Sequence, residues 1–413
     1  MLSPQSTETV KATAGVVAEH AEEITKRFYP HMFEAHPELM RVFNKANQAI
    51  GEQPKALAAS VVAYAVHLID PAAPDFTPIM QRIAHKHVSL GIKSYEYTIV
   101  GHHLMWAIGD VLGDAVTPEI ASAWDEVYWL FACQLIAEEG KLYALGGTDP
   151  EHPYRPYTVV ERNDETPESF SLVIKPAEGE LPTHHTGQYV AVAVDLPNGE
   201  RQPRQYTISG VPGREAFRLT IKRVHGADDV PDGQVSNWLA DNAVVGTTLD
   251  VSQPAGDVVL EESDAPLVLV SAGIGITPMA AILEDLSQRQ PHRSVRVFHA
   301  DRSHAHQALY TPMRGQAEAM HDVVGQFWYE EEAESAPTIH PARPGLMDLS
   351  DAEIPSGAKV FMCGPLPFMQ VVRRTLIDKG VAPEDISYEV FGPDLWAQNP
   401  DNADNPDNPD NAV

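Results

Sequence analysis

Two neighbouring histidines, His85 and His87, lie in a segment whose apolar residues recur at three- and four-residue intervals. This spacing predicts a helix over residues 76–90 with Ile83 and Ala84 on its apolar face. His87 belongs to that face and should point inward, whereas His85 lies about 200° around the helix and should face solvent. A neutral imidazole binds a metal through one nitrogen while a hydrogen bond orients the other. His87 is therefore a candidate metal ligand, although a lone histidine on an apolar face is more often a hydrogen-bonded core residue.

A carboxylate also falls on an apolar helical stripe. Glu139 shares a face with Leu135, Ile136 and Leu142, where an unpaired charge would be costly. Either the side chain has a buried partner or it lies at the edge of the stripe, an alternative that the adjacent Glu138 keeps open.

Glycine-containing motifs lie in the last two thirds of the chain. GQVSNWL at 233–239 is a glycine turn that leads into a helix start, whose free N–H groups can hold a phosphate. SAGIGITPM at 271–279 follows an apolar strand and opens a helix, which is the order that dinucleotide pyrophosphate binding requires. Shorter motifs accompany them: GQY at 187–189, RQYT at 204–207, CGPLPFM at 363–369 and YEVFGPD at 388–394.

The periodicity predicts which elements carry these residues. Helices are expected over 9–35, 52–69, 76–90, 95–113 and 118–145, followed by a proline-rich linker. Period-two strands are expected over 157–161, 169–175, 189–194, 205–209 and 218–224, as an antiparallel sheet or barrel. Strands over 266–272, 295–299, 323–328, 359–362 and 387–391 alternate with helices and predict a parallel sheet. The fold class is thus multidomain: an all-α domain, an antiparallel β-barrel and an α/β domain.

Composition narrows the partners. The 413 residues carry a formal net charge of −29, which argues against nucleic acid or an anionic membrane as a partner. We find neither a spanning apolar run nor a signal peptide, so a cytoplasmic protein is the default expectation. The two cysteines, Cys133 and Cys363, are too far apart in sequence to indicate a zinc motif or a disulfide framework. The Asp/Asn/Pro-rich tail at 397–413 is expected to be disordered.

The N-terminal segment resembles the globins, specifically the bacterial flavohaemoglobins. FYPHMFEAHPELMRVFNKANQ at 28–48, then Gln53, Leu57 and AHKH at 84–87, carry the resemblance. It implies that His87 is the proximal haem-iron ligand, that Phe43 packs on the porphyrin, and that Tyr29, Gln53 and Leu57 line the distal pocket. Without the resemblance, Gln53 could equally be a solvated polar residue.

The resemblance also implies a proximal network. Tyr97 and Glu139 would join His87, give the imidazole anionic character and favour O–O activation over oxygen carriage. Lys86, beside the ligand, would tune the haem potential, although a solvated lysine fits the sequence as well.

The glycine motifs resemble those of the ferredoxin–NADP reductase superfamily and occur in the same order. In that family the arginine of the RxYS motif meets the flavin pyrophosphate, the tyrosine packs on the isoalloxazine and the hydroxyl hydrogen-bonds the ring. Here Thr207 replaces the more usual serine, and Ile276 replaces a polar residue that binds the cofactor. Phe391 would cover the flavin, and Glu389 would lie near the haem–flavin contact. The residues that the resemblance assigns to FAD and NAD(P)H are Gln188, Tyr189, Arg204, Gln205, Tyr206, Thr207, Gly233, Gln234, Val235, Ser236, Ser271, Ala272, Gly273, Ile274, Gly275, Ile276, Thr277, Cys363, Gly364, Pro365, Glu389, Phe391, Gly392 and Pro393.

The sequence leaves the choice between NADH and NADPH open. Asp301 would repel a 2′-phosphate, whereas Arg302 would attract one.

Together the resemblances imply a haem-binding globin domain over 1–147, an FAD-binding barrel over 153–262 and an NAD(P)-binding domain over 263–396. The implied activity is that of a monomeric nitric oxide dioxygenase, which turns nitric oxide and O2 into nitrate with electrons passed from NAD(P)H through FAD to haem b. A general flavin or haem reductase (of peroxide, quinone or ferric iron) and a haem-based gas sensor are the alternatives.

Overall fold

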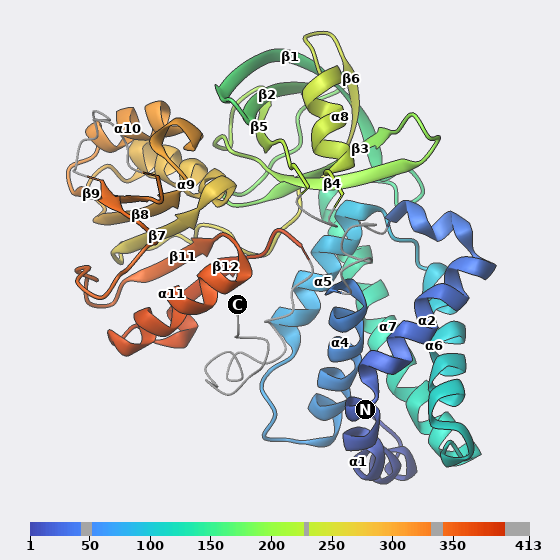
Figure 1. The fold of residues 1–413 in the computed structure, drawn as a ribbon. Coiled ribbons are helices and arrows are strands. Elements are labelled where there is room, and N and C mark those ends of the chain that lie inside the picture. Colours follow the sequence, from blue (N-terminus) through green and yellow to red (C-terminus); the bar gives the residue numbers. More distant parts are fainter. Residues whose placement is uncertain (43–51, 227–230, 332–341, 393–413) are drawn as a thin grey trace. The chain divides into compact units, whose positions relative to one another are not determined.

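Helices build the N-terminal third of the chain (Figure 1). The computed structural model describes residues 1–42, 52–226, 231–331 and 342–392, without the side chains of 52–55. The helices are α1 (Pro4–Glu19), α2 (Ala21–Ala35), η1 (Pro37–Val42), α4 (Glu52–Ile69), α5 (Thr77–Leu90), α6 (Glu96–Leu112), η2 (Gly113–Ala115) and α7 (Pro118–Gly146). The expected fold class is confirmed, beginning with this all-α part.

One predicted helix is wrong. The segment expected as a single helix over 9–35 forms α1 and α2, which are separated at His20. The buried residues Val17 and Ile24 on either side are seven positions apart, which is also the spacing within one continuous helix. The apolar pattern therefore stays in phase across the break and cannot reveal it.

The helices enclose one hydrophobic core that contains Phe28, Met32, Trp124 and Tyr128. Helices α6 and α7 approach closely at Gly101, where a Cβ atom would lie 2.4 Å from Cε1 of the Tyr128 ring. Tyr128 in turn donates its hydroxyl hydrogen to the backbone oxygen of Tyr97. This contact fixes the position of Tyr97 relative to α7.

The described residues beyond the helices, most of which form a second compact unit, contain two six-stranded sheets (Figure 1). The first has the strand order β4-β3-β6-β1-β2-β5, and its β1–β2, β2–β5 and β3–β6 pairs are antiparallel. Its elements are β1 (Tyr154–Thr166), β2 (Ser169–Pro176), β3 (Tyr189–Asp195), β4 (Arg201–Thr207), β5 (Phe217–Lys222), α8 (Gln234–Asn242) and β6 (Thr248–Ser252). Strand β6 was not predicted, and β4 begins and ends earlier than the expected 205–209.

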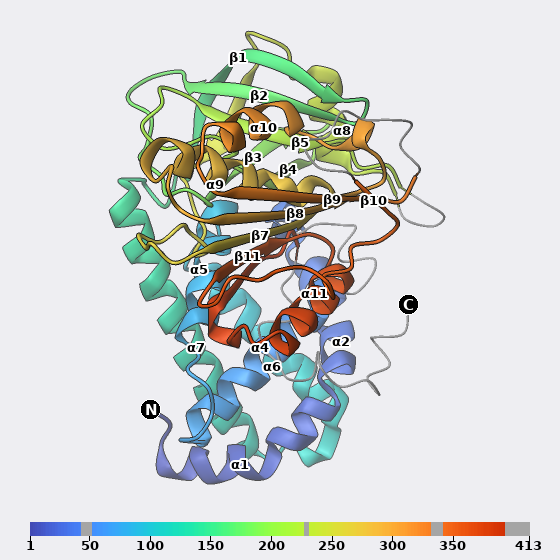
Figure 2. The ribbon, with the colours of Figure 1, turned by 90° about the vertical axis from the view of Figure 1, so that its left-hand side faces the viewer.

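The other sheet is parallel throughout, in the order β10-β9-β8-β7-β11-β12. Its elements are β7 (Leu267–Ala272), η3 (Gly273–Gly275), α9 (Ile276–Arg289), β8 (Val295–Asp301), η4 (His304–His306), α10 (Tyr310–Glu318), β9 (Val323–Tyr329), β10 (Arg343–Pro344), β11 (Lys359–Cys363), α11 (Leu366–Asp378), η5 (Pro383–Asp385) and β12 (Ile386–Glu389). Helices α9 and α10 cover one face and α11 covers the other (Figure 2).

The strand order reverses between β7 and β11. Strands β8 and β9 extend the sheet on one side of β7, whereas β11 and β12 extend it on the other side. Ligands of open parallel sheets bind beyond the carboxyl ends of the strands at such a switch point. The motifs at 271–279 and 363–369 both begin there.

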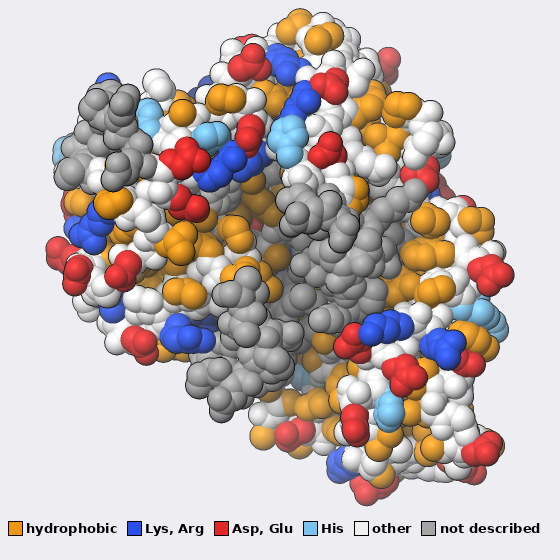
Figure 3. Space-filling model, in the orientation of Figure 1, with side chains coloured by type: hydrophobic (Ala, Val, Ile, Leu, Met, Phe, Trp, Pro, Cys, Tyr) orange, Lys and Arg blue, Asp and Glu red, His pale blue; other side chains and the backbone are white. Residues whose placement is uncertain are grey.

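Acidic side chains are spread over the visible face rather than gathered in one patch (Figure 3). Within the described residues, no helix combines the length and the apolar character that a membrane crossing requires.

Gly101→Ala should lower the free energy of unfolding of the helical unit by about 1–3 kcal/mol, because the new methyl group would overlap the Tyr128 ring. The measurement is urea unfolding followed by far-ultraviolet ellipticity. Gly109→Ala in the same helix is the matched control, since no atom lies within 4 Å of its Cβ position. That variant should gain up to about 1 kcal/mol. Equal midpoints for the two variants would contradict the packing described here.

Candidate functional site

A buried polar network surrounds one nitrogen of His87. Nδ1 of His87 lies 2.8 Å from the Tyr97 hydroxyl and 2.8 Å from Oε1 of Glu139. The Tyr97 hydroxyl also donates to Oε1 of Glu139. Tyr97 and Glu139 are both buried. Helices α5, α6 and α7 thus each contribute one member, and Glu139 lies inside the bundle with two partners rather than at its edge.

The network fixes where the protons are. Burial, reinforced by the charge of Glu139, raises the pKa of Tyr97 well above its usual range. The phenol therefore stays protonated and donates a hydrogen bond to the carboxylate. A carboxylate oxygen only accepts hydrogen bonds, so the imidazole proton facing it belongs on Nδ1. The lone pair of His87 is then on Nε2, which has no hydrogen-bond partner among the described residues. The His87 side chain is 30% exposed, so the network leaves part of the imidazole uncovered.

Two of the predicted distal residues lie against the same helical core. Tyr29 of α2 is buried within it, and Leu57 of α4 packs against it. Burial raises the pKa of Tyr29, which leaves the hydroxyl a hydrogen-bond donor. Phe43 lies outside the described residues, as does the side chain of Gln53, whose backbone belongs to α4.

His85 and Lys86 flank the network on α5. His85, which was expected to point largely to solvent, is half-buried. Lys86 is also half-buried, and its Nζ donates to the backbone oxygen of Gly392 at 2.6 Å. Pro393 lies outside the described residues.

The RQYT motif forms the end of β4. Thr207 is buried, while Arg204, Gln205 and Tyr206 are half-buried. Tyr206 packs against the core of the antiparallel sheet. Burial raises the pKa of Tyr206 and lowers the pKa of Arg204. A tyrosine face and an arginine side by side on one strand end fit an aromatic ring that carries a pyrophosphate.

The GQY motif contacts backbone groups of neighbouring loops. Gly187 has a φ of +110°, and a Cβ atom there would lie 2.4 Å from the backbone oxygen of Val258. The Gln188 side chain accepts from the N–H of His185 at 2.9 Å and donates to the oxygen of Gly256 at 3.2 Å. Both ends of the Gln188 side chain therefore hold the loop that enters β3 at Tyr189.

Helix α8 begins at Gln234, and its N-cap, Gly233, provides no side-chain cap. Val235 and Ser236 are buried, whereas Gln234 is exposed. The Ser236 hydroxyl donates to the oxygen of Gly233 at 3.1 Å and accepts from the N–H of Val224 at 3.2 Å. A helix start without a side-chain cap suits a phosphate.

The two motifs at the switch point touch each other. A Cβ atom on Gly275 would lie 2.3 Å from the backbone oxygen of Cys363, and one on Gly364 would lie 2.8 Å from the Phe368 ring. Gly273, with a φ of +53°, faces open space instead. Helix α9 starts directly afterwards without a side-chain cap. This glycine cradle beside a free helix start fits a dinucleotide pyrophosphate.

The side chains around the cradle serve the fold. Ile276 lies in the hydrophobic core, and Thr277 donates to the backbone oxygen of Ile274 at 3.1 Å. The Ser271 hydroxyl is 2.9 Å from Nδ1 of the buried His299.

Sequence reasoning missed a partner of the loop after β8. The guanidinium of Arg302 donates to Glu168, which lies 134 residues earlier in the chain. Oδ1 of Asp301 accepts from the N–H of Arg302 at 2.8 Å. No local pattern could have indicated Glu168, because the two residues meet only through the tertiary fold.

Cys363 ends β11, where it pairs with Ser271 on one side and with Glu389 on the other. Burial, together with the nearby charge of Glu389, raises the pKa of Cys363 well above its usual range. Glu389 is buried, and Phe391, beyond the end of β12, is half-exposed.

Known families account for the three parts of the chain. Residues 26–135 match the globin family, residues 177–260 the oxidoreductase FAD-binding domain, and residues 269–374 the oxidoreductase NAD-binding domain. The fold and site thus define a globin joined to a flavin- and nicotinamide-dependent oxidoreductase module.

Full-length relatives make the assignment specific. Flavohemoproteins from Bordetella pertussis and Chromobacterium violaceum are each 40% identical to this chain, cover 95% of it, and are themselves covered over 99% and 98% of their lengths. The chain therefore belongs to the flavohemoprotein family, as its motifs indicated.

Solved structures agree. The flavohemoglobin from Malassezia yamatoensis, which has bound FAD and heme, matches with a TM-score of 0.84 and 34% identity over 95% of this chain and all of its own. The FAD/NAD-binding domain of a nitric oxide dioxygenase from Vibrio cholerae matches 58% of this chain and 98% of its own, with a TM-score of 0.54 and 33% identity.

Iodoacetamide should label Cys133 but not Cys363 in the native protein near neutral pH. Cys133 is exposed, whereas Cys363 is buried and its raised pKa keeps it in the unreactive thiol form. Peptide mass spectrometry would locate the label, and denatured protein, in which both cysteines react, is the control. Native labelling of Cys363 at the rate of Cys133 would contradict the environment described here.

Proposed function

We propose that this flavohemoprotein is a nitric oxide dioxygenase that combines nitric oxide with O2 to give nitrate. Haem supplies the iron at which O2 and nitric oxide meet, and FAD carries the electrons that NADH donates. The observation that carries the proposal is the oriented imidazole of His87, with Nδ1 held by Tyr97 and Glu139 and Nε2 open to a metal.

The network gives His87 more than an anchoring role. A carboxylate that accepts from Nδ1–H increases the basicity of Nε2 and pushes electron density toward the iron. Such a ligand suits O–O activation better than reversible oxygen carriage. On the other side of the pocket, the protonated Tyr29 hydroxyl would donate a hydrogen bond to the bound ligand, and Leu57 would limit the entry of water.

The remaining motifs would hold the electron donors. Arg204, Tyr206 and Thr207 would bind FAD, while the cradle of Gly273, Gly275 and Cys363–Gly364 would hold the dinucleotide. The name of the Vibrio cholerae relative, nitric oxide dioxygenase, supports the assignment for this half. The enzyme would act as a cytoplasmic monomer. Light scattering on the purified protein would test the oligomeric state.

The structure favours NADH over NADPH. Asp301 would repel a 2′-phosphate, and Arg302, which could attract one, is already paired with Glu168. The ratio of kcat/KM for the two nucleotides would test this, and equal values would contradict it.

His87→Ala should abolish nitrate formation from nitric oxide under air, whereas His85→Ala, two residues along the same helix, should keep it. Nitrate and NADH consumption would be measured together. Each nitrate requires one electron, so wild-type enzyme should form two nitrates per NADH. Undiminished nitric oxide consumption by His87→Ala would favour a plain flavin reductase, and wild-type protein that binds nitric oxide without steady NADH oxidation would favour a gas sensor.

A further inference from the structure

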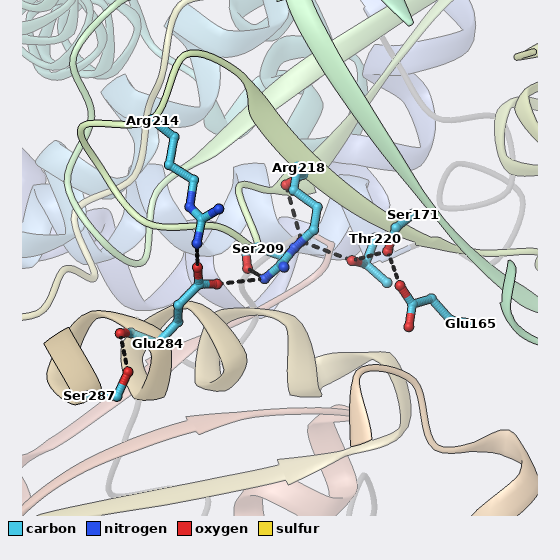
Figure 4. Close-up of polar contacts among 8 residues, drawn as sticks. All are labelled: Glu165, Ser171, Ser209, Arg214, Arg218, Thr220, Glu284 and Ser287. Carbon is cyan, nitrogen blue, oxygen red and sulfur yellow. Dashed lines mark hydrogen bonds and ion pairs between the residues drawn. The ribbon is translucent and has the colours of Figure 1, made fainter. Parts of the chain in front are cut away.

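A buried carboxylate on α9 connects the two sheets of the second unit (Figure 4). The Glu284 side chain is only 4% exposed. Its Oε2 accepts from the guanidinium of Arg218 on β5 at 2.9 Å, and its Oε1 accepts from Arg214 in the preceding loop. A carboxylate in this position depends on its partners, because an unpaired buried charge is strongly unfavourable.

The same ion pair extends to the segment just beyond β4, the strand that carries the RQYT motif. Arg218 also donates to the backbone oxygen of Ser209, and its Nε lies 3.3 Å from the Ser209 hydroxyl (Figure 4). Ser209 follows Thr207 of the RQYT motif by two residues. The hydroxyls of Ser209, Thr220 and Ser171 form a buried chain with contacts of 2.8 and 2.9 Å, which anchors this strand end in the sheet.

A second contact joins the same helix to the other flavin motif. Oδ2 of Asp285 accepts from the Thr186 hydroxyl at 2.5 Å. Thr186 immediately precedes the GQY motif. At its other end, α9 begins directly after the glycine turn of the dinucleotide cradle. One helix therefore has the candidate dinucleotide loop at its start and, two turns later, attachments to residues that flank both flavin motifs.

The two arginines contribute unequally. Arg214 is 57% exposed, so its ion pair is screened and weak. Arg218 is 24% exposed and binds the backbone oxygen of Ser209, two residues beyond β4, as well as Glu284. The connection from α9 to the end of β4 therefore runs mainly through Glu284 and Arg218.

We propose that Glu284 is a positioning residue for hydride transfer, which sets the approach of the nicotinamide to the flavin. The proposal rests on the reductase part of the proposed function. In the step concerned, the C4–H bond of NADH breaks, its hydride with both electrons goes to FAD, and solvent supplies a proton, which leaves NAD⁺ and reduced flavin. Reacting atoms must lie about 3–3.5 Å apart, and a misplacement of about 1 Å can cost on the order of 10²-fold in rate.

The test is anaerobic stopped-flow reduction of the bound flavin by NADH in the full-length holoenzyme. Glu284→Gln should lower the limiting rate per bound flavin by about tenfold or more, with a much smaller change in the apparent Kd for NADH. Glu284→Asp, which keeps the charge, should recover part of the rate. Glu215→Gln is the matched control, since Glu215 adjoins Arg214 but is 90% exposed and pairs with Lys175.

A merely structural role would reduce the yield or thermal stability of the enzyme but not the limiting rate per bound flavin. Equal limiting rates for Glu284→Gln and Glu215→Gln would overturn the proposal, as would a loss confined to NADH affinity. Flavin reduction needs neither haem nor nitric oxide, so failure of the dioxygenase chemistry would leave this test intact. A wild-type flavin that NADH cannot reduce would overturn the positioning role and the proposed function together.

Discussion

A carboxylate inside an apolar helical bundle is tolerated only when its hydrogen bonds are satisfied. Glu139 meets that condition through Tyr97 and His87, one partner from each of the two neighbouring helices. The same three-way contact selects the imidazole tautomer and aims its remaining lone pair away from the network. The contact between α5, α6 and α7 and the orientation of His87 thus depend on one set of hydrogen bonds.

The reductase module depends on a different constraint: segments of backbone approach each other too closely for a side chain to lie between them. Gly275 and Gly364 bring the ends of β7 and β11 into contact at the switch point of the parallel sheet, and Gly187 does the same for the loop before β3. Side chains at these motifs mostly support the loops, as Gln188 and Ser271 do. The candidate cofactor loops are therefore shaped largely by main chain, and close approaches at Gly187, Gly275 and Gly364 leave no room for a Cβ atom there.

Local patterns predicted most of the fold and the glycine turn at 271–279. Helical periodicity placed His87 and Glu139 on inward helical faces, and the structure has the predicted order of strand, glycine turn and helix. The break at His20 escaped because the apolar pattern continues in phase across it. The partners of Arg302 and Glu284 escaped for another reason: Glu168, Arg214 and Arg218 lie 66 to 134 residues away from them, and no spacing rule links residues at such separations.

The ferrous iron–imidazole stretching frequency, read by resonance Raman spectroscopy on the unliganded protein, tests most directly whether Glu139 controls the proposed iron ligand. Glu139→Gln should lower this frequency, because a neutral amide cannot give His87 the anionic character that the carboxylate gives it. Glu138→Gln, one residue away and paired with Lys141, should leave it unchanged. A Glu139→Gln protein with the wild-type frequency would contradict the account.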